Sequence, residues 1–121
     1  MSYVAAAKAA LELSFKERTN VNGSNVPVYR GGNSFEIRSS DIRINPENGL
    51  VRTGYGLSLN IDPTKVEKFG GAYLLNNLPE SLKKIIQRGN DAGHFEIVPA
   101  YEMALEEFQN LLNMIKVTPG G

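Results

Sequence analysis

Short connections between the predicted strands constrain the fold of this chain more than any other feature of its sequence. Segments that alternate between apolar and polar residues, as half-buried strands do, are separated by glycine, proline and asparagine turns. These segments are 26–30, 56–60, 72–75, 82–87 and 93–99. Each crossover between parallel strands takes about a dozen residues or more, and the connections are too short for several of them. The pattern therefore favours a twisted, mostly antiparallel sheet over a doubly wound parallel one.

Apolar residues at helical spacing predict helices near both ends of the chain. Residues 3–17 read as an amphipathic helix with one apolar stripe, and 101–117 as a second with acidic residues toward its N-terminal end. A third, short helix is expected to open at Asp62-Pro63 and to run to Phe69. Residues 118–121 are expected to be a frayed end. Helices flanking a central sheet give an α+β fold.

The polar, glycine-containing segment 19–25 is typical of a linker. It divides the chain into an N-terminal helix and linker, residues 1–25, and a compact domain, residues 26–121. A chain of 121 residues can bury a core of its own. Lys8 and Glu12 interrupt the apolar pattern of the first helix, which argues against a signal peptide and for synthesis in the cytoplasm. No apolar run approaches the length of a membrane span, so no membrane association is expected.

Several local patterns allow two interpretations. Pro27 places its strand either at a sheet edge or at the start of the strand. Segment 35–44 alternates like a strand, but Ser39-Ser40-Asp41 could also cap a helical turn. Residues 45–49 (NPENG) predict a turn.

Two clusters of small or basic residues also have a structural and a functional interpretation. Gly31-Gly32 favours a turn, although it could let a ligand approach the backbone. Lys83-Lys84 with Arg88 favours a solvated basic face over contact with phosphate or RNA.

Composition excludes several kinds of chemistry. The chain has no cysteine, so disulfides, thiolate zinc sites and thiol nucleophiles are absent. It has one histidine, which rules out a histidine-rich metal site within one subunit, and no metal is expected. Thirteen basic and thirteen acidic side chains give a formal net charge of zero, which argues against a strongly basic nucleic-acid surface.

Three predicted strands carry polar residues opposite an apolar face. These residues are Arg30 after Val28, Ser58 with Asn60, and His94 with Glu96. If the strands meet, their cleft holds a guanidinium, a hydroxyl, an imidazole and a carboxylate. The guanidinium fork matches two phosphate oxygens, and a carboxylate can stabilise an oxocarbenium-like charge on a sugar. The set suits a phosphorylated nucleoside substrate.

Each of these residues also has a purely structural interpretation. Arginines at strand ends are commonly solvated, and Ser58 could be a hydrogen-bonded strand serine. His94 could be a satisfied structural histidine. Glu96 could be an exposed charge that protects a sheet edge from aggregation.

The order of these residues resembles a known family. Val28-Tyr29-Arg30-Gly31 resembles the opening Tyr-Arg-Gly strand of ADP-ribosyltransferases, whose arginine binds the NAD phosphates. Gly56-Leu57-Ser58-Leu59 resembles their central serine-containing strand. Glu96, on a late strand, stands where these enzymes carry the catalytic glutamate.

The resemblance is closer to small bacterial toxins with an ADP-ribosyltransferase-like fold, the Tse-two kind of type VI secretion effector. The shared order is Gly49-Leu50, Gly56-x-Ser58, Leu78-Pro79-x-x-Leu82-Lys83 and His94-aromatic-x-Ile97-x-Pro99-Ala100-x-x-Met103. It covers roughly residues 26–115. That kind of toxin does not reliably carry a carboxylate at the position of Glu96, and the N-terminal helix has no matching counterpart.

The resemblance implies a toxin or effector domain for interbacterial competition with NAD as its substrate, which transfers ADP-ribose to an intracellular target or hydrolyses NAD. Tyr29, Arg30, Gly31, Ser58 and Asn60 would bind NAD, with Arg30 on the phosphates and Ser58 at the nicotinamide ribose. Ser58, His94 and Glu96 would be catalytic: Glu96 would stabilise the developing cation, with His94 aligning it.

The same resemblance implies a cellular setting. The domain would be made in the cytoplasm and delivered into the cytoplasm of a target cell. A cognate immunity protein or antitoxin would accompany it.

Two other functions are compatible with the sequence. A metal-independent ribonuclease toxin would use His94 and Glu96 as acid and base, with Arg30 or Lys83 on the phosphate. The neutral net charge counts against this function, because proteins that cleave RNA tend to be basic. A non-enzymatic binding module is the third, and a pocket too shallow for a dinucleotide would favour it.

Overall fold

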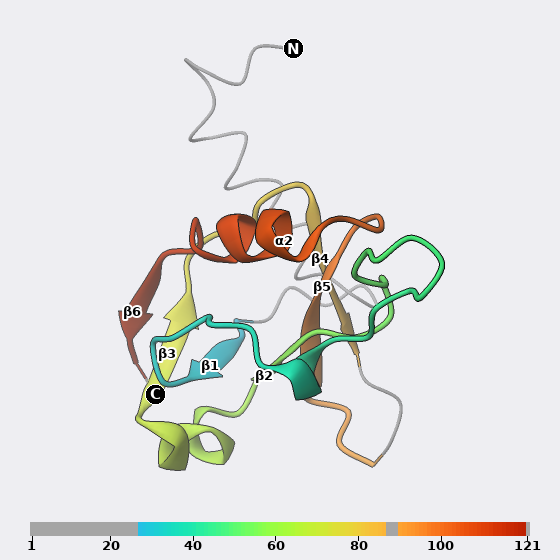
Figure 1. Ribbon diagram of the computed structural model, residues 1–121. Coiled ribbons are helices and arrows are strands. Elements are labelled where there is room, and N and C mark those ends of the chain that lie inside the picture. Colours follow the sequence, from blue (N-terminus) through green and yellow to red (C-terminus); the bar gives the residue numbers. More distant parts are fainter. Residues whose placement is uncertain (1–26, 87–89, 121) are drawn as a thin grey trace.

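Figure 1 shows the computed structural model, which describes residues 27–86 and 90–120. Within this part of the chain lie one six-stranded antiparallel sheet and one α-helix. The strands are β1 (Tyr29–Gly31), β2 (Leu57–Asn60), β3 (Ala72–Leu75), β4 (Leu82–Ile86), β5 (His94–Pro99) and β6 (Val117–Pro119), and the helix is α2 (Leu105–Leu112). Their order across the sheet is β4-β5-β2-β1-β3-β6. The predicted α+β class and antiparallel sheet are confirmed, whereas the predicted N-terminal helix and linker lie outside the described residues.

The core forms between one face of the sheet and α2. Register pairs Leu57 with Ile97 and Leu59 with Phe95, so the apolar faces of β2 and β5 coincide. Phe108 of α2 is fully buried against them. Because side chains alternate between the two faces, a slip of one residue in either strand would expose its apolar set. Burial of this face therefore fixes the register that also places the polar residues on the other face. No helix among the described residues is long and apolar enough to cross a bilayer.

The β1–β2 connection resolves the two interpretations of segment 35–44. The centre of segment 35–44 is a 3-10 turn, η1 (Ser39–Asp41). The last residue of the segment, Ile44, forms an isolated bridge with Val51. The predicted turn at 45–49 is confirmed: Gly49 has φ of 75° and donates its N–H to the Asn45 carbonyl. Pro27 precedes β1, which lies inside the sheet, so the strand-start interpretation of this proline is correct.

The predicted helix 101–117 is wrong at both ends. The Met103 carbonyl accepts a hydrogen bond from Val51 N–H and Ala104 is extended, so α2 begins only at Leu105. The helix ends at Leu112, and residues 117–119 pair with β3 as the edge strand β6. The frayed end predicted for 118–121 is therefore wrong for residues 118 and 119. The open edge of β3 offers backbone partners that a longer helix could not use, and a pattern of local spacing does not reveal such a distant partner.

The predicted helix opening at Asp62-Pro63 is two 3-10 turns, η2 (Pro63–Lys65) and η3 (Glu67–Phe69). The Asp62 carboxylate accepts from Thr64 N–H, as an N-cap should, but Val66 at φ −112° interrupts the run. Gly70 ends it with φ of 113°. These turns lie at the end of the sheet opposite α2 (Figure 1).

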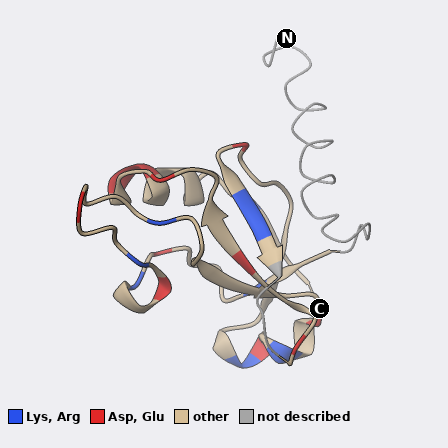
Figure 2. Cartoon of the chain, turned by 90° about the vertical axis from the view of Figure 1, so that its right-hand side faces the viewer, with Lys and Arg blue, Asp and Glu red and all other residues tan. Residues whose placement is uncertain are grey.

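The solvated basic face predicted for the lysine pair of β4 is wrong for Lys84. In Figure 2 this pair is the basic segment of β4. Lys83 is exposed, whereas Lys84 faces the core with 4% exposure and its Nζ lies 5.8 Å from the centre of the Phe95 ring. Alternation along β4 requires one of two adjacent residues to face inward. Burial lowers the pKa of the Lys84 ammonium to about 7.

Lys84 is expected to make the stability of this protein depend on pH in the alkaline range. Between about pH 7 and the ordinary lysine pKa of 10.5, the unfolded chain holds a proton that the folded chain has lost. The free energy of unfolding should therefore rise with pH in this range, by up to about 1.4 kcal/mol per unit. Urea unfolding between pH 7 and 10 measures the slope. Lys84→Met should lose this component of the slope, and Lys83→Met should keep it; equal slopes in the two variants would contradict the assignment.

Gly56 marks a close contact between β2 and β5 backbones. A Cβ atom at this position would lie 1.6 Å from the Ile97 carbonyl oxygen, whereas one at Gly54 would meet nothing within 4 Å. We expect Gly56→Ala to lower the free energy of unfolding by about 2 kcal/mol or more, as overpacking does. Gly54→Ala should change it by less than about 1 kcal/mol. Denaturant unfolding of both variants checks this, and an equal effect would contradict the contact.

Candidate functional site

A cleft opens where β1 separates from β2. The two strands pair only at Tyr29 and Asn60, whereas β1 stays paired with β3 through Gly31 and Ala72. The Gly32 N–H extends that second pairing with a 2.8 Å hydrogen bond to the Gly71 carbonyl. Beyond Tyr29, β1 therefore follows β3, and a cleft of about 910 Å³ lies at the divergence.

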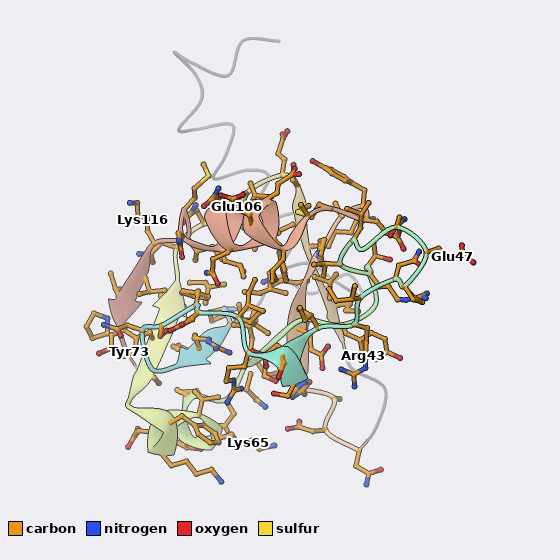
Figure 3. All side chains as sticks on the ribbon, in the orientation of Figure 1. Arg43, Glu47, Lys65, Tyr73, Glu106 and Lys116 are labelled. Atoms are coloured by element: carbon orange, nitrogen blue, oxygen red, sulfur yellow. The ribbon has the colours of Figure 1, made fainter. Side chains whose placement is uncertain are left out.

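Three parts of the chain line this cleft. Residues 31–38 form one side, η2 and η3 form another, and β2 with the first residue of β5 completes it. In Figure 3, Lys65 of η2 lies at the end of the molecule opposite Glu106 of α2. The polar side chains among the lining residues include Arg30, Asn33, Ser34, Glu36, Arg38, Ser58, Asn60, Lys65 and His94.

Arg30 connects the two strands where the sheet divides. Its Nη1 donates to the Ser58 carbonyl at 2.9 Å, and its Nε donates to the Ser34 carbonyl at 3.1 Å. Its guanidinium carbon lies 5.6 Å from the centre of the Phe35 ring. Burial lowers the pKa of Arg30, yet a guanidinium keeps its charge at neutral pH. Two of its five N–H groups are used in this way, and no described residue accepts a hydrogen bond from Nη2.

Arg38 is a second cation of the cleft, and Asp41 holds it in place. The carboxylate accepts from Arg38 Nε at 3.3 Å and Nη2 at 3.2 Å, and also from the Arg38 backbone N–H at 2.9 Å. The hydrogen bond with Asp41 raises the pKa of Arg38. Asp41 is a buried residue of the 3-10 turn η1, so its carboxylate fixes the orientation of the Arg38 side chain.

Lys65 is the third cation, and Asp91 connects it to β2. The Asp91 carboxylate accepts from Lys65 Nζ at 3.1 Å, from Asn60 Nδ2 at 3.0 Å and from Gly93 N–H at 2.9 Å. These donors, with Asn60 the most important, lower the pKa of Asp91 to about 2. The Asn60 amide oxygen in turn accepts from Asp62 N–H. The buried Asn60 side chain therefore links Asp91, which precedes β5, to Asp62, which precedes the 3-10 turns.

The register of β2 and β5 places the predicted polar faces side by side. Ser58 lies opposite Glu96, and Asn60 lies opposite His94. The Glu96 carboxylate accepts from Gly56 N–H at 3.2 Å, and its other oxygen lies 3.5 Å from His94 Nε2. Both side chains are mostly buried.

Five of the seven residues singled out from the sequence line the cleft. They are Arg30, Gly31, Ser58, Asn60 and His94. Glu96 and Tyr29 are outside its lining: Glu96 lies behind His94, and the Tyr29 ring lies beside Gly120. Gly31 has a packing role as well, because a Cβ there would lie 2.8 Å from the Val66 carbonyl oxygen.

Sequence reasoning missed the cations on the other walls of the cleft. Arg38 lies next to the capping signal Ser39–Asp41, and Lys65 lies next to Asp62-Pro63. These signals predicted the positions of the turns, but they did not indicate that both cations face the same cleft. The exposed ring of Phe69 also lines the cleft and had no signal. These residues come together only through contacts between distant segments.

The arrangement suits an anionic ligand. Arg30, Arg38 and Lys65 outnumber the single lining carboxylate, Glu36. Arg38 and Lys65 are ion-paired, whereas Arg30 makes no ion pair with any carboxylate of the described residues. No group of three or more acidic or histidine side chains in residues 27–86 and 90–120 is placed to hold a metal ion. The donors that the cleft offers an anion include the guanidinium groups of Arg30 and Arg38 and the ammonium of Lys65.

Comparison of the chain with protein-family models, curated proteins and solved structures finds no match.

Replacement of Arg30 should destabilise the fold where β1 and β2 separate. Arg30→Ala removes two charge-assisted hydrogen bonds to backbone carbonyls, and we expect the free energy of unfolding to fall by about 2 kcal/mol. Arg43→Ala is the matched control, because Arg43 also contacts an aromatic ring, that of Tyr55 at 4.7 Å, and its own local carbonyls. It should cost less than about 1 kcal/mol. Urea unfolding compares the two; an equal loss would contradict a bridging role for Arg30.

Proposed function

We propose that the cleft between β1 and β2 binds NAD, and that this chain is a toxin domain of the ADP-ribosyltransferase-like kind. It would cleave the bond between nicotinamide and ribose and transfer ADP-ribose to an intracellular target or to water. The observation that carries the proposal is the Arg30 guanidinium, fixed through Nε and Nη1 and open at Nη2.

The size and charge of the cleft support a dinucleotide. A volume of about 910 Å³ is near the top of the roughly 300–1,000 Å³ range of small-molecule sites. A guanidinium held through two of its donors keeps further N–H groups, those of Nη2 among them, for the oxygens of a diphosphate. Arg38 and Lys65 add positive charge on the neighbouring walls. A volume of this size favours a dinucleotide site over the shallow pocket that would favour a non-enzymatic binding module.

The nicotinamide–ribose bond of the substrate would lie near Ser58, His94 and Glu96. Ser58 is exposed and lines the cleft beside Asn60. His94 and Glu96 follow on the next strand, so a ribose placed near Ser58 would lie close to the His94 imidazole, with the Glu96 carboxylate beside that ring. Negative charge and hydrogen bonds at this end would stabilise the oxocarbenium-like transition state.

The toxin part of the proposal rests on the motif order shared with type VI effectors of the Tse-two kind. It includes delivery into the cytoplasm of a target cell and neutralisation by a cognate immunity protein or antitoxin. The macromolecular target is left open, and nucleic acid is one candidate.

NAD binding and consumption by the purified domain test the proposal. Calorimetry should detect NAD binding, and chromatography should detect released nicotinamide, alone or with target-cell lysate as the source of acceptor. Arg30→Lys keeps the charge but loses the fork, so the dissociation constant should rise by about tenfold or more.

The control for this test is Arg43→Ala, because Arg43 is not among the residues that line the cleft. It should bind as the unchanged domain does. Absence of NAD binding by the folded domain, or equal binding by Arg30→Lys, would contradict the proposal.

A metal-independent ribonuclease is the second candidate, and the contact between His94 and Glu96 favours it. An imidazole beside a carboxylate can serve as the acid–base pair that phosphodiester cleavage needs. Incubation of total RNA with the domain separates the two functions: RNA cleavage without NAD consumption would favour the ribonuclease.

A further inference from the structure

The two nitrogens of the His94 ring lie in different surroundings. Nε2 is fully enclosed, makes no hydrogen bond with any described residue, and lies 3.5 Å from a Glu96 carboxylate oxygen. Nδ1 is not enclosed in this way, and the residue lines the cleft. One nitrogen therefore faces a carboxylate inside the protein, and the other belongs to a ring whose residue lines the cleft.

This contact selects the tautomer of the neutral ring. A lone pair on Nε2 would face the carboxylate with no donor between them, which is unfavourable in an enclosed place. A proton on Nε2 instead points toward Glu96, and the distance is one that tightens into a hydrogen bond when a ligand orders the site. With the proton on Nε2, Nδ1 carries the lone pair and can accept a proton from the cleft.

Glu96 is itself held by the backbone. One of its oxygens accepts from Gly56 N–H at 3.2 Å, at the place where β2 and β5 approach too closely for any side chain at residue 56. The carboxylate is outside the lining of the cleft. Its position suits it to orient the imidazole and to stabilise the imidazolium, not to touch a ligand.

We infer that His94 Nδ1 is the general base of this site, that Glu96 is its positioning residue, and that the acceptor of ADP-ribose is a hydroxyl, of water or of an alcohol. The inference rests on the proposed function. A hydroxyl gains most from such a base, because its proton becomes acidic only as the oxygen bonds to carbon.

The step balances without any further reagent. The bond between ribose C1′ and the nicotinamide nitrogen breaks, and its electron pair neutralises the positive charge of that ring. The acceptor oxygen bonds to C1′ while its proton moves to His94 Nδ1. The imidazolium, stabilised by Glu96, then releases that proton to solvent.

The single histidine of the chain makes the inference directly measurable. In tag-free protein labelled with ¹⁵N-histidine, long-range ¹H–¹⁵N correlation spectra above pH 7.5 report which ring nitrogen carries the proton. We expect the proton on Nε2, and addition of NAD should shift the Nδ1 resonance. In Glu96→Gln the amide oxygen can still accept from Gly56 N–H, so the amide NH₂ faces Nε2 and the proton should move to Nδ1. Glu106→Gln, on exposed α2, is the control and should leave the tautomer unchanged.

Turnover supplies the second readout. Glu96→Gln should lower kcat by about 100-fold while KM for NAD stays nearly constant. His94→Ala should lose a similar factor and recover part of it when imidazole is added, which a structural role would not allow. The product should be ADP-ribose or an O-glycosidic adduct of an alcohol.

The outcomes separate this inference from the proposed function. A proton on Nδ1 in the unaltered domain, or full turnover in His94→Ala, would overturn the inference even if NAD is consumed. Failure of the unaltered domain to bind NAD would overturn the proposed function, and the assignment of His94 with it.

Discussion

The contact between the Arg30 guanidinium and the Ser58 carbonyl is the interaction on which the rest of this structure depends. A sheet that divides between its central strands leaves backbone groups without ladder partners, which is costly when they are buried. Here a side chain takes the place of part of that ladder. Because a guanidinium carries more donors than the backbone can use, the residue that closes the gap also presents N–H groups to the space it spans. Fold stability and the proposed anion binding thus depend on the same side chain.

The other cations of the cleft are held in a different way. Arg38 and Lys65 each lie against a carboxylate that is fixed by backbone N–H groups, those of Arg38 and Gly93. Such pairs contribute little to stability near the surface, but they restrict where the charges lie. The cleft therefore offers a ligand two oriented charges and the Arg30 guanidinium, which forms no ion pair with a carboxylate of the described residues.

Alternation predicted the central strands β2 and β5 well, because each has one apolar face in the core. Residues 72–75 are a strand as predicted, and the strands predicted at 56–60 and 93–99 are confirmed to within one residue at each end. Local alternation gave wrong predictions where a segment distant in the sequence determines the structure. The C-terminal residues form β6 because β3 has an open edge, and Lys84 is buried because its neighbour occupies the exposed side of β4.

The sequence predicted the part of the candidate site that the register of β2 and β5 determines. Leucines on one face of β2 place Ser58 and Asn60 on the other, opposite Glu96 and His94. That His94 faces the cleft with Glu96 behind it depends on the side-chain rotamers and on Gly56, which no spacing in the sequence encodes. The walls that carry Arg38 and Lys65 belong to segments whose positions only long-range packing determines.

The most direct measurement of the central claim is a titration of the ¹⁵N-labelled domain with NAD, followed by backbone amide shifts. Saturable changes are expected at Gly31–Arg38, Ser58–Asn60 and Lys65–Gly70, the segments that surround Arg30. No change is expected at Leu105 or Asn110, which line a second groove beside α2 that shares only Ile37 with the cleft. Shifts confined to that groove, or no shifts at millimolar NAD, would contradict the claim that the divided sheet forms a dinucleotide site.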